Sequence, residues 1–262
     1  MSQAIMVAGG SPAGMEATRI AALRGHEVTL YEKNGMLGGT LTFANTVKGP
    51  HENLADLIAY PERQLELVGV TVVTDTEVTT DVVASEARGA LVLACGGVRD
   101  TLGLGGSTST QAVPFEQFMF TEMGDNVTIY GSDRQAVDAA LWLQNRGEYV
   151  TMVTPPTSDE VDKGQSNHEK EFILPMLYAR GMRVWPSATI TAIGDGEITF
   201  TGEAGCEITI ACDAVVEGMD MLPNKGLLDE VPAAETYTIG DCNEPFNIAL
   251  AIRGGDDVGR AM

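Results

Sequence analysis

The sequence predicts an α/β fold with parallel sheets, because two separate stretches alternate between short apolar runs and helical spacing. Residues 4–33 have the order strand, glycine turn, helix, strand, and residues 126–156 repeat it. Short apolar runs that end in glycine are typical of buried parallel strands, and a helix provides the crossover between them. With 262 residues and 44% hydrophobic content, the chain can form one large domain or two modest ones.

The first strand–helix–strand unit begins close to the N-terminus. Residues 4–8 (AIMVA) form an apolar run that ends in Gly9, which predicts a buried strand. Residues 13–24 place apolar side chains at helical spacing, and Gly25 is a natural stop signal. Residues 27–33 (EVTLYEK) form the second apolar run.

The turn of this unit carries a glycine pattern that favours an anionic dinucleotide. Gly9 permits a sharp turn, Gly14 permits close packing of helix on strand, and the free amides of the first helical turn can face a pyrophosphate. Glu32 follows Gly14 by 18 residues, where a carboxylate can accept hydrogen bonds from the adenosine ribose. Ser11 replaces the middle glycine, so its Cβ intrudes, but its hydroxyl can donate to a phosphate oxygen. We expect weaker or slightly displaced binding rather than loss.

Further elements follow along the chain. Residues 35–41 form a second glycine cluster, and residues 52–69 have helical spacing that Pro61 should kink or split. Residues 70–78 alternate like a strand, and residues 89–97 form a buried strand that ends in glycines. Near the C-terminus, a strand at 236–239 ends in Gly240 and Asp241, and a helix begins at about residue 248.

The second unit has a degenerate version of the turn. Gly131, Asp133 and Ala136 stand at the three pattern positions, and a carboxylate at the middle one repels a pyrophosphate. The second strand ends in Thr154 rather than in an acid for NAD or an arginine for a 2′-phosphate. Arg134 could partly compensate. Two alternatives therefore remain for this unit. Either it keeps a second nucleotide site, formed by Gly131, Ser132, Asp133 and Arg134, or it keeps the fold while the site is altered or lost.

Composition and charge exclude several classes of function. The formal net charge is −21, from 37 acidic and 16 basic residues, which disfavours nucleic acid and anionic membranes as partners. This acidity serves either solubility or docking of a basic partner. No apolar run approaches the ~20 residues that span a bilayer, and no leader precedes the first strand, so we expect a cytoplasmic protein.

The sequence offers no clear catalytic or metal-binding set. The four cysteines include no CxxC arrangement, so we expect reduced thiols rather than a redox dithiol or a metal site. No Ser/His/Asp or Cys/His combination stands out. We therefore assign no catalytic residue and no metal ligand.

Three ordered motifs carry a resemblance to a known family: VAGGSPAGMEATRIAALRGHEVTLYEKNGMLGGTL, ALVLACGG and AETYTIGDCNEPFNIALAIRGGDDVGRAM. Together they resemble the C-terminal flavin- and nucleotide-binding portion of the fused Old Yellow Enzyme family, which includes 2,4-dienoyl-CoA reductase and trimethylamine dehydrogenase. The resemblance implies two Rossmann-like dinucleotide-binding domains of the glutathione-reductase type, the second inserted in the first. The implied boundaries are 1–122 with 213–262 for an FAD- or ADP-binding domain, and 123–212 for an inserted NAD(P)-binding-like domain.

The resemblance also implies roles at the far end of the chain. Asp241 of the GDC motif would reach the ribityl or pyrophosphate region. The start of the last helix would lie beside the flavin pyrimidine, where its positive end can stabilise reduced flavin. With the turn pattern, the candidate cofactor-binding residues are Gly9, Ser11, Pro12, Ala13, Gly14, Glu32, Lys33, Gly38, Gly39, Thr40, Leu41, Val78, Ala94, Cys95, Gly96, Gly240, Asp241, Ile248 and Ala249.

Two functions follow from these expectations. In the first, the chain is an FAD-binding oxidoreductase subunit that passes electrons to a separate barrel-type Old Yellow Enzyme flavoenzyme, with NAD(P)H as a doubtful donor. The family's N-terminal barrel and its iron–sulfur cysteines are missing from the sequence, which is why we expect a separate partner. In the second, the chain is a nonredox assembly or regulatory subunit with ADP or nothing bound.

Overall fold

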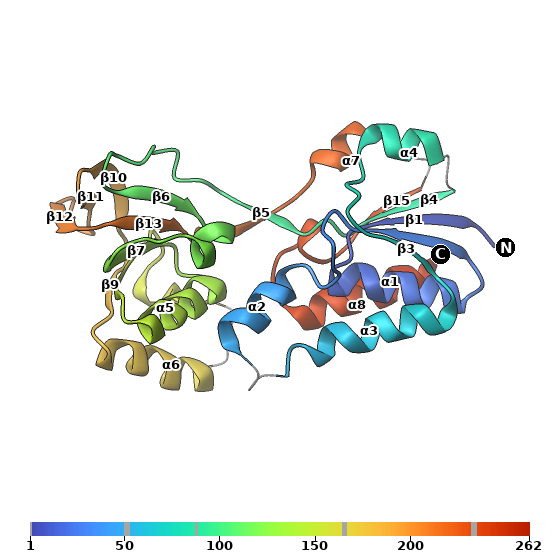
Figure 1. The fold of residues 1–262 in the computed structure, drawn as a ribbon, viewed down its shortest axis with the longest axis horizontal. Helices are drawn as coiled ribbons and strands as arrows, with labels where there is room; N and C mark the ends of the chain where they lie inside the picture. Colours follow the sequence, from blue (N-terminus) through green and yellow to red (C-terminus); the bar gives the residue numbers. More distant parts are fainter. Residues whose placement is uncertain (1, 50–52, 87–88, 164–166, 232–234) are drawn as a thin grey trace. The chain divides into compact units, whose positions relative to one another are not determined.

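The fold contains two compact units (Figure 1). The computed structural model describes residues 2–49, 53–86, 89–163, 167–231 and 235–262. Unit 1 comprises Met1–Val98 and Met221–Met262, and unit 2 comprises Arg99–Asp220. The expected boundaries assign residues 99–122 and 213–220 to the first domain instead. The structure differs there because strands from both stretches pair within the sheet of unit 2.

Unit 1 contains a five-stranded sheet in the order β15-β4-β1-β2-β3, in which every pair is parallel. Because all strands run the same way, the loops that follow β1, β4 and β15 meet at one edge of the sheet. The strands are β1 (Ala4–Ala8), β2 (Glu27–Tyr31), β3 (Thr71–Val73), β4 (Ala90–Leu93) and β15 (Thr236–Thr238).

Helices cover both faces of this sheet, and Figure 1 shows α1, α3 and α8 on one face and α4 and α7 on the other. The first face buries Ile5, Val7 and Leu30 against α1, with Leu65 of α3 in the same core. The helices of unit 1 are α1 (Pro12–Leu23), α2 (Thr40–Lys48), α3 (Asp56–Val68), α4 (Thr80–Glu86), α7 (Gly226–Glu230) and α8 (Ile248–Ala261), with a short 3-10 helix η4 (Gly240–Cys242).

Two expectations for unit 1 are corrected in part. Pro61 is expected to kink or split its helix, and α3 continues through Pro61 without a split. Proline forfeits one internal hydrogen bond, and the burial of Leu65, which is 1% exposed, outweighs that loss. The strand expected over 70–78 is confined to Thr71–Val73, because Asp75 adopts a left-handed conformation (φ 53°) that ends it.

Unit 2 contains a second parallel five-stranded sheet, in the order β6-β13-β7-β8-β9, and a three-stranded antiparallel sheet, β10-β11-β12. Side chains of the antiparallel sheet such as Ile198 and Phe200 share a core with Tyr130, Val153 and Val215 of the parallel one. The strands are β6 (Gln111–Pro114), β7 (Asn126–Tyr130), β8 (Tyr149–Val153), β9 (Arg183–Trp185), β10 (Thr189–Gly194), β11 (Glu197–Thr201), β12 (Glu207–Ala211) and β13 (Ala214–Glu217).

The remaining elements complete the α/β architecture that the sequence predicts. Unit 2 has helices α5 (Arg134–Arg146) and α6 (Asn167–Ala179), and 3-10 helices η2 (Phe115–Phe120) and η3 (Ser158–Glu160). Strands β5 (Gly97–Arg99) and β14 (Met221–Pro223) pair with each other. Within the described part of the chain, no helix has both the length and the apolar character that crossing a membrane requires.

Candidate functional site

At two positions of the turn that follows β1, neighbouring backbone atoms leave no space for a Cβ. Gly9 has a φ of 109°, and a Cβ there would lie 2.3 Å from the carbonyl oxygen of Ala94. A Cβ on Gly14 would lie 1.9 Å from the carbonyl oxygen of Gly9. Both distances are far inside van der Waals contact, so these glycines allow β4 and α1 to approach the turn closely.

Ser11 caps α1 at the middle position of the glycine pattern. Its backbone is extended (φ −68°, ψ 168°), a conformation that any residue adopts without strain. The Ser11 hydroxyl accepts a hydrogen bond from the N–H of Gly14 over 3.4 Å and donates one to the carbonyl of Ala94 over 3.3 Å. The hydroxyl that we expected to donate to a phosphate is thus engaged within the turn, and it leaves the end of α1 without a charge.

The carboxylate of Glu32 is buried beneath this turn, with 5% of the residue exposed. One oxygen accepts from the N–H of Gly10 over 2.8 Å, and the other accepts from Asn34 through its N–H over 2.9 Å and its side-chain amide over 2.8 Å. A carboxylate has about four acceptor positions, so Glu32 retains capacity for one further donor.

The second glycine cluster closes over the first turn. The N–H of Gly38 donates to the carbonyl of Gly10 over 2.8 Å. A Cβ on Gly39, the residue before α2, would lie 3.3 Å from the Cβ of Ser11. Residues 38 and 39 both have positive φ, 114° and 54°, which favours glycine. Thr40 is the first residue of α2, and the next residue of that helix, Leu41, is buried.

The ends of β4 and β15 complete the edge. A Cβ on Gly240 would lie 2.9 Å from the Cβ of Ala13 and 3.7 Å from that of Ala251, which links α1 to the first turn of α8. Burial raises the pKa of the Asp241 carboxyl, and a hydrogen bond from the Phe246 N–H partly opposes that rise. Burial also raises the pKa of the Cys95 thiol to about 11.

The structure brings part of the expected cofactor set together around one turn. Hydrogen bonds and close approaches connect Gly9, Ser11, Ala13, Gly14, Gly39, Ala94 and Gly240, and Gly38 joins them through its hydrogen bond to Gly10. Val78 and Cys95 lie together in the core on the opposite face of the sheet, with Cys242. Ile248 and Ala249 begin α8, whose cap is the Asn247 side chain, which accepts from the N–H of Leu250 over 2.9 Å. Pro12 is the first residue of α1, and Lys33 and Gly96 follow Glu32 and Cys95 in their loops.

Unit 2 forms the same kind of turn after β7, but a carboxylate caps its helix. A Cβ on Gly131 (φ 138°) would lie 1.7 Å from the carbonyl oxygen of Gly218. Asp133 accepts from the N–H of Ala136 over 2.8 Å and forms an ion pair with Arg99 over 3.0 Å. Burial raises the pKa of the Asp133 carboxyl, and the neighbouring guanidinium of Arg99 opposes the rise.

Arg99 is buried in unit 2, and its two terminal nitrogens are hydrogen-bonded there. Its side chain is only 4% exposed, and its guanidinium donates to the carbonyl of Met219 and to the side chain of Gln135. The same group lies 4.1 Å from the ring centre of Phe115. The guanidinium therefore fills the space next to the first turn of α5.

The other residues of the candidate second site are also engaged within unit 2. Arg134, expected to compensate for Asp133 at a phosphate, pairs instead with Asp138 over 3.3 Å and with the buried Asp162 over 3.5 Å. Thr154 donates its hydroxyl proton to the Ser132 hydroxyl over 2.9 Å, and both side chains are buried.

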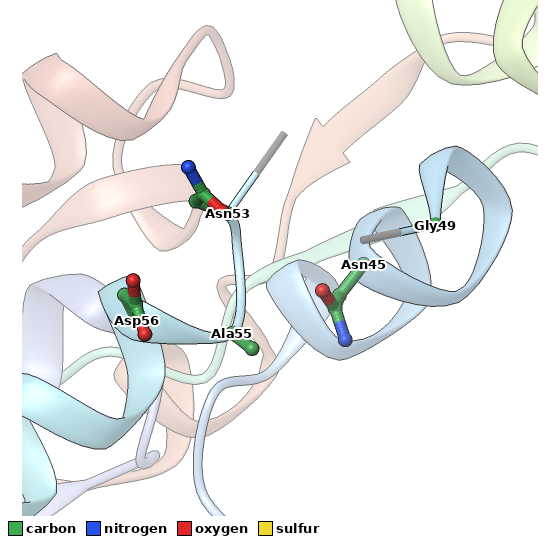
Figure 2. A pocket seen from close by; sticks show the side chains of 5 residues that line it. All are labelled: Asn45, Gly49, Asn53, Ala55 and Asp56. Atoms are coloured by element: carbon green, nitrogen blue, oxygen red, sulfur yellow. The ribbon is translucent and has the colours of Figure 1, made fainter. Parts of the chain in front are cut away.

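A pocket of about 380 Å³ lies at the end of α2 and the start of α3 (Figure 2). It is lined by Asn45, Gly49, Asn53, Ala55 and Asp56. None of these lining residues belongs to the cofactor set expected from the sequence. Within the described part of the chain, no group of three or more His, Cys, Asp or Glu side chains could hold a metal ion.

Sequence reasoning missed three contributors to these turns. Gly10 and Asn34 are the donors that fix Glu32, and Arg99 is the partner of Asp133. The contact of Asn34 with Glu32 had a local signal, because an asparagine two positions after an acid at a strand end is close enough to donate to its carboxylate. Arg99 had none, since 34 residues separate it from Asp133.

The two turns define a dinucleotide-binding type of α/β protein, and comparison with known proteins identifies the family. Residues 3–246 match the family described as pyridine nucleotide-disulphide oxidoreductase, and the chain belongs to that family. It is 28% identical over 98% of its length to cinnamate reductase of Clostridium sporogenes, and 28% identical over 97% to NADH oxidase of Thermoanaerobacter brockii.

Solved structures show the same relationship. A 2-naphthoyl-CoA reductase complex matches the whole chain with a TM-score of 0.87 and 27% identity, and it confirms the two-domain Rossmann-like fold class. Histamine dehydrogenase from Rhizobium sp. 4-9 matches with a TM-score of 0.86 at 23% identity, which supports the fold alone. The resemblance to the nucleotide-binding portion of fused Old Yellow Enzyme-like proteins is confirmed.

The chain spans only part of these relatives. It covers 39% of cinnamate reductase, 40% of NADH oxidase and 40% of the 2-naphthoyl-CoA reductase chain. The relatives therefore carry the region that matches this chain within larger proteins.

Proposed function

We propose that unit 1 binds FAD and exchanges electrons with a barrel-type flavoenzyme, which is a separate subunit or another part of a longer polypeptide. The observation that carries this proposal is the turn after β1. The helix that follows this turn, α1, begins at an uncharged N-cap, Ser11, and its first four residues, 12–15, include no acid. A helix N-terminus without a negative charge is suited to a pyrophosphate.

The residues present fit this cofactor. Gly9, Gly38 and Gly39 leave backbone rather than side chains at the turn, so a pyrophosphate can approach closely. Glu32 is fixed by Gly10 and Asn34, and its remaining acceptor capacity suits a ribose hydroxyl. The N-terminus of α8 adjoins Gly240, where its positive end would favour an anionic ring.

The flavin would supply the hydride and single-electron chemistry, while this chain would supply binding, orientation and electrostatics. Asp241 beside Gly240 would accept hydrogen bonds near the ribityl chain, and the hydrogen bond from Phe246 fixes its carboxylate. We assign no proton transfer to any residue. The larger size of the relatives supports a partner domain or subunit that delivers or takes the electrons.

The visible spectrum of the purified protein tests this proposal. We expect a flavin band near ~450 nm, as purified or after incubation with FAD. Ser11→Asp should lower the affinity for FAD by at least about tenfold, because it places a charge at the pyrophosphate while keeping the helix cap. Ser11→Asn is the matched uncharged control and should have a much smaller effect.

Three results would contradict the proposal or a part of it. A colourless protein that takes up no FAD and releases ADP on denaturation would favour the nonredox alternative. Equal affinities of the Ser11→Asp and Ser11→Asn variants would show that the cofactor does not lie at this turn. If the FAD-loaded, native-length protein contains no second flavin within its complex, the barrel-type partner is wrong.

A further inference from the structure

Units 1 and 2 repeat one hydrogen-bond pattern around their turns. The N–H of Gly9 donates to Tyr31 over 2.8 Å, and that of Gly131 donates to Val153 over 3.0 Å. The loop that closes each turn is bound in the same way as well. The carbonyl of Gly10 accepts from Gly38 over 2.8 Å, whereas the carbonyl of Ser132 accepts from Asp162 over 2.7 Å. The positions in the two units can therefore be matched one by one.

The matched positions differ in charge at the two places nearest the helix N-terminus. The cap is Ser11 in unit 1 and Asp133 in unit 2. The closing loop presents Gly38 in unit 1 and the fully buried Asp162 in unit 2. At these two matched positions, unit 2 thus has carboxylates, Asp133 and Asp162, and unit 1 has none.

Arginines within unit 2 bind both of these carboxylates. Arg99 pairs with Asp133 over 3.0 Å, and Arg134 pairs with Asp162 over 3.5 Å. These are the cations that could otherwise attract a pyrophosphate to this turn. The positive end of α5 is likewise used, because Asp133 accepts from the N–H of Ala136.

We infer that unit 2 excludes NADH and NADPH, and that Asp133 and Asp162 are the residues that determine this exclusion. Both carboxylates lie at the positions that match Ser11 and Gly38 of unit 1, so their charge opposes a pyrophosphate at this turn, and the arginines that could attract one are paired with them. The family name and the relative named an NADH oxidase imply a pyridine nucleotide, but the residues of this chain do not fit one. Electrons would then enter and leave the chain without a pyridine nucleotide bound at unit 2.

Hydrogen exchange of backbone amides tests this inference and separates it from FAD binding. The full chain is compared with and without NADH, NADPH or FAD at about 1 mM each. For the wild-type protein, we expect no protection of residues 131–136 by either pyridine nucleotide. Protection of residues 9–14 by FAD reports the proposed function independently, so one proposal can fail while the other holds.

Variants that copy unit 1 into unit 2 test the cause. Asp133→Ser combined with Asp162→Gly reproduces the residues at positions 11 and 38, and NADH affinity, measured by nucleotide fluorescence, should rise by at least about tenfold. The single variant Asp133→Ser, which keeps a helix cap, should show a smaller gain. Asp159→Ser, at an exposed position in η3, is the control and should show none.

The outcomes are decisive in either direction. Protection of residues 131–136 by NADH or NADPH in the wild-type protein would overturn the inference, whatever the variants do. A folded double variant that gains no affinity would show that the carboxylates are not the cause. If the double variant does not fold, the single variant Asp133→Ser decides, and no gain in that protein would overturn the inference.

Discussion

Ser11 and Asp133 hold the same position in their two units, and each accepts a hydrogen bond from the N–H three residues later. The distance is 3.4 Å from the Ser11 hydroxyl to Gly14 and 2.8 Å from the Asp133 carboxylate to Ala136. One cap is neutral and the other is anionic. The charge of one side chain at this turn position therefore distinguishes a helix N-terminus with a neutral cap from one whose positive end already faces a carboxylate.

Replacing Ser11 tests its role as a cap. Ser11→Ala should lower the free energy of unfolding by about 1 kcal/mol, whereas Ser11→Gly should cost only a few tenths. Chemical unfolding followed by circular dichroism measures both. Ser85→Ala, at an exposed position in α4, is the control and should stay within about 0.5 kcal/mol of the wild type.

The same glycine variant tests the steric effect of the serine on the cofactor. Ser11→Gly should bind FAD more tightly than the wild type, because it removes the Cβ beside the expected pyrophosphate. Flavin fluorescence titration measures the affinity. Unchanged affinity would show that the serine side chain does not restrict the site.

Removing Arg99 should destabilise unit 2 by about 3 kcal/mol, because it leaves the Asp133 carboxylate without its charged partner. The sequence contains two tryptophans, Trp142 and Trp185, and both lie in unit 2, so tryptophan fluorescence reports its unfolding. The variant is Arg99→Gln. The control is Lys163→Gln in the same unit: its side chain is 78% exposed and lies 3.7 Å from Glu160, so the change should cost about 0.5 kcal/mol or less.

Two adjacent glycines of α8 should respond in opposite ways to alanine. A Cβ on Gly255 would lie 2.4 Å from the carbonyl oxygen of Ala13, so Gly255→Ala should cost about 2 kcal/mol. The nearest atoms to a Cβ on Gly254 lie 3.9 Å away, so Gly254→Ala should stabilise the helix by about 0.5 kcal/mol. Unfolding of unit 1 by circular dichroism compares the pair. Equal effects would contradict the close contact of α1 with α8.

Cys95 should resist alkylation at neutral pH. Its pKa is raised from 9.0 to about 11 by burial, so its thiolate fraction falls about a hundredfold. Iodoacetamide labelling followed by mass spectrometry should modify the exposed Cys206 first. Faster labelling of Cys95 than of Cys206 would contradict the assigned burial.

Asp241 should make stability depend on pH in a stated direction. Because burial raises its pKa in the folded state, the folded protein favours the protonated carboxyl. Its stabilising contribution is present at low pH and is lost as the pH rises through the folded-state pKa. Asp241→Asn should therefore be more stable than the wild type at pH 7, and the difference should shrink as the pH falls through the folded-state pKa and be lost below about 4, the pKa of an unperturbed aspartate. A difference that does not change with pH would contradict this account.

The sequence predicts the parallel units well because their signals are local. The apolar run at 4–8 coincides with β1, the unit expected over 126–156 begins with the strand β7, and Gly25 follows the end of α1. The antiparallel strands β10 and β11 were missed, although the Asp195-Gly196 pair between two alternating runs is a recognised hairpin signal. Strands β6 and β13 lack such a signal, since their pairing joins residues about 100 positions apart.

The candidate site was predictable in part. The glycines and Glu32 follow from spacing, because the turn, the helix and the strand end lie within 30 residues. The pairing of Asp133 with Arg99, and of Arg134 with Asp162, depends on how separate loops fold back onto one helix end. No periodicity records that proximity. The charge at the second turn was therefore visible in the sequence, but its neutralisation was not.

The composition of unit 1 from two chain segments has a consequence for protein synthesis. Strand β15 lies beside β4 although it begins 143 residues after β4 ends, and α8 packs on α1. Unit 2 is one continuous segment, so a nascent chain can finish it as soon as residue 220 has left the ribosome. Unit 1 must wait for its last strand and helix. Helix α8 can thus pack against α1, which carries the neutral cap, only after the segment that forms unit 2 has been synthesised.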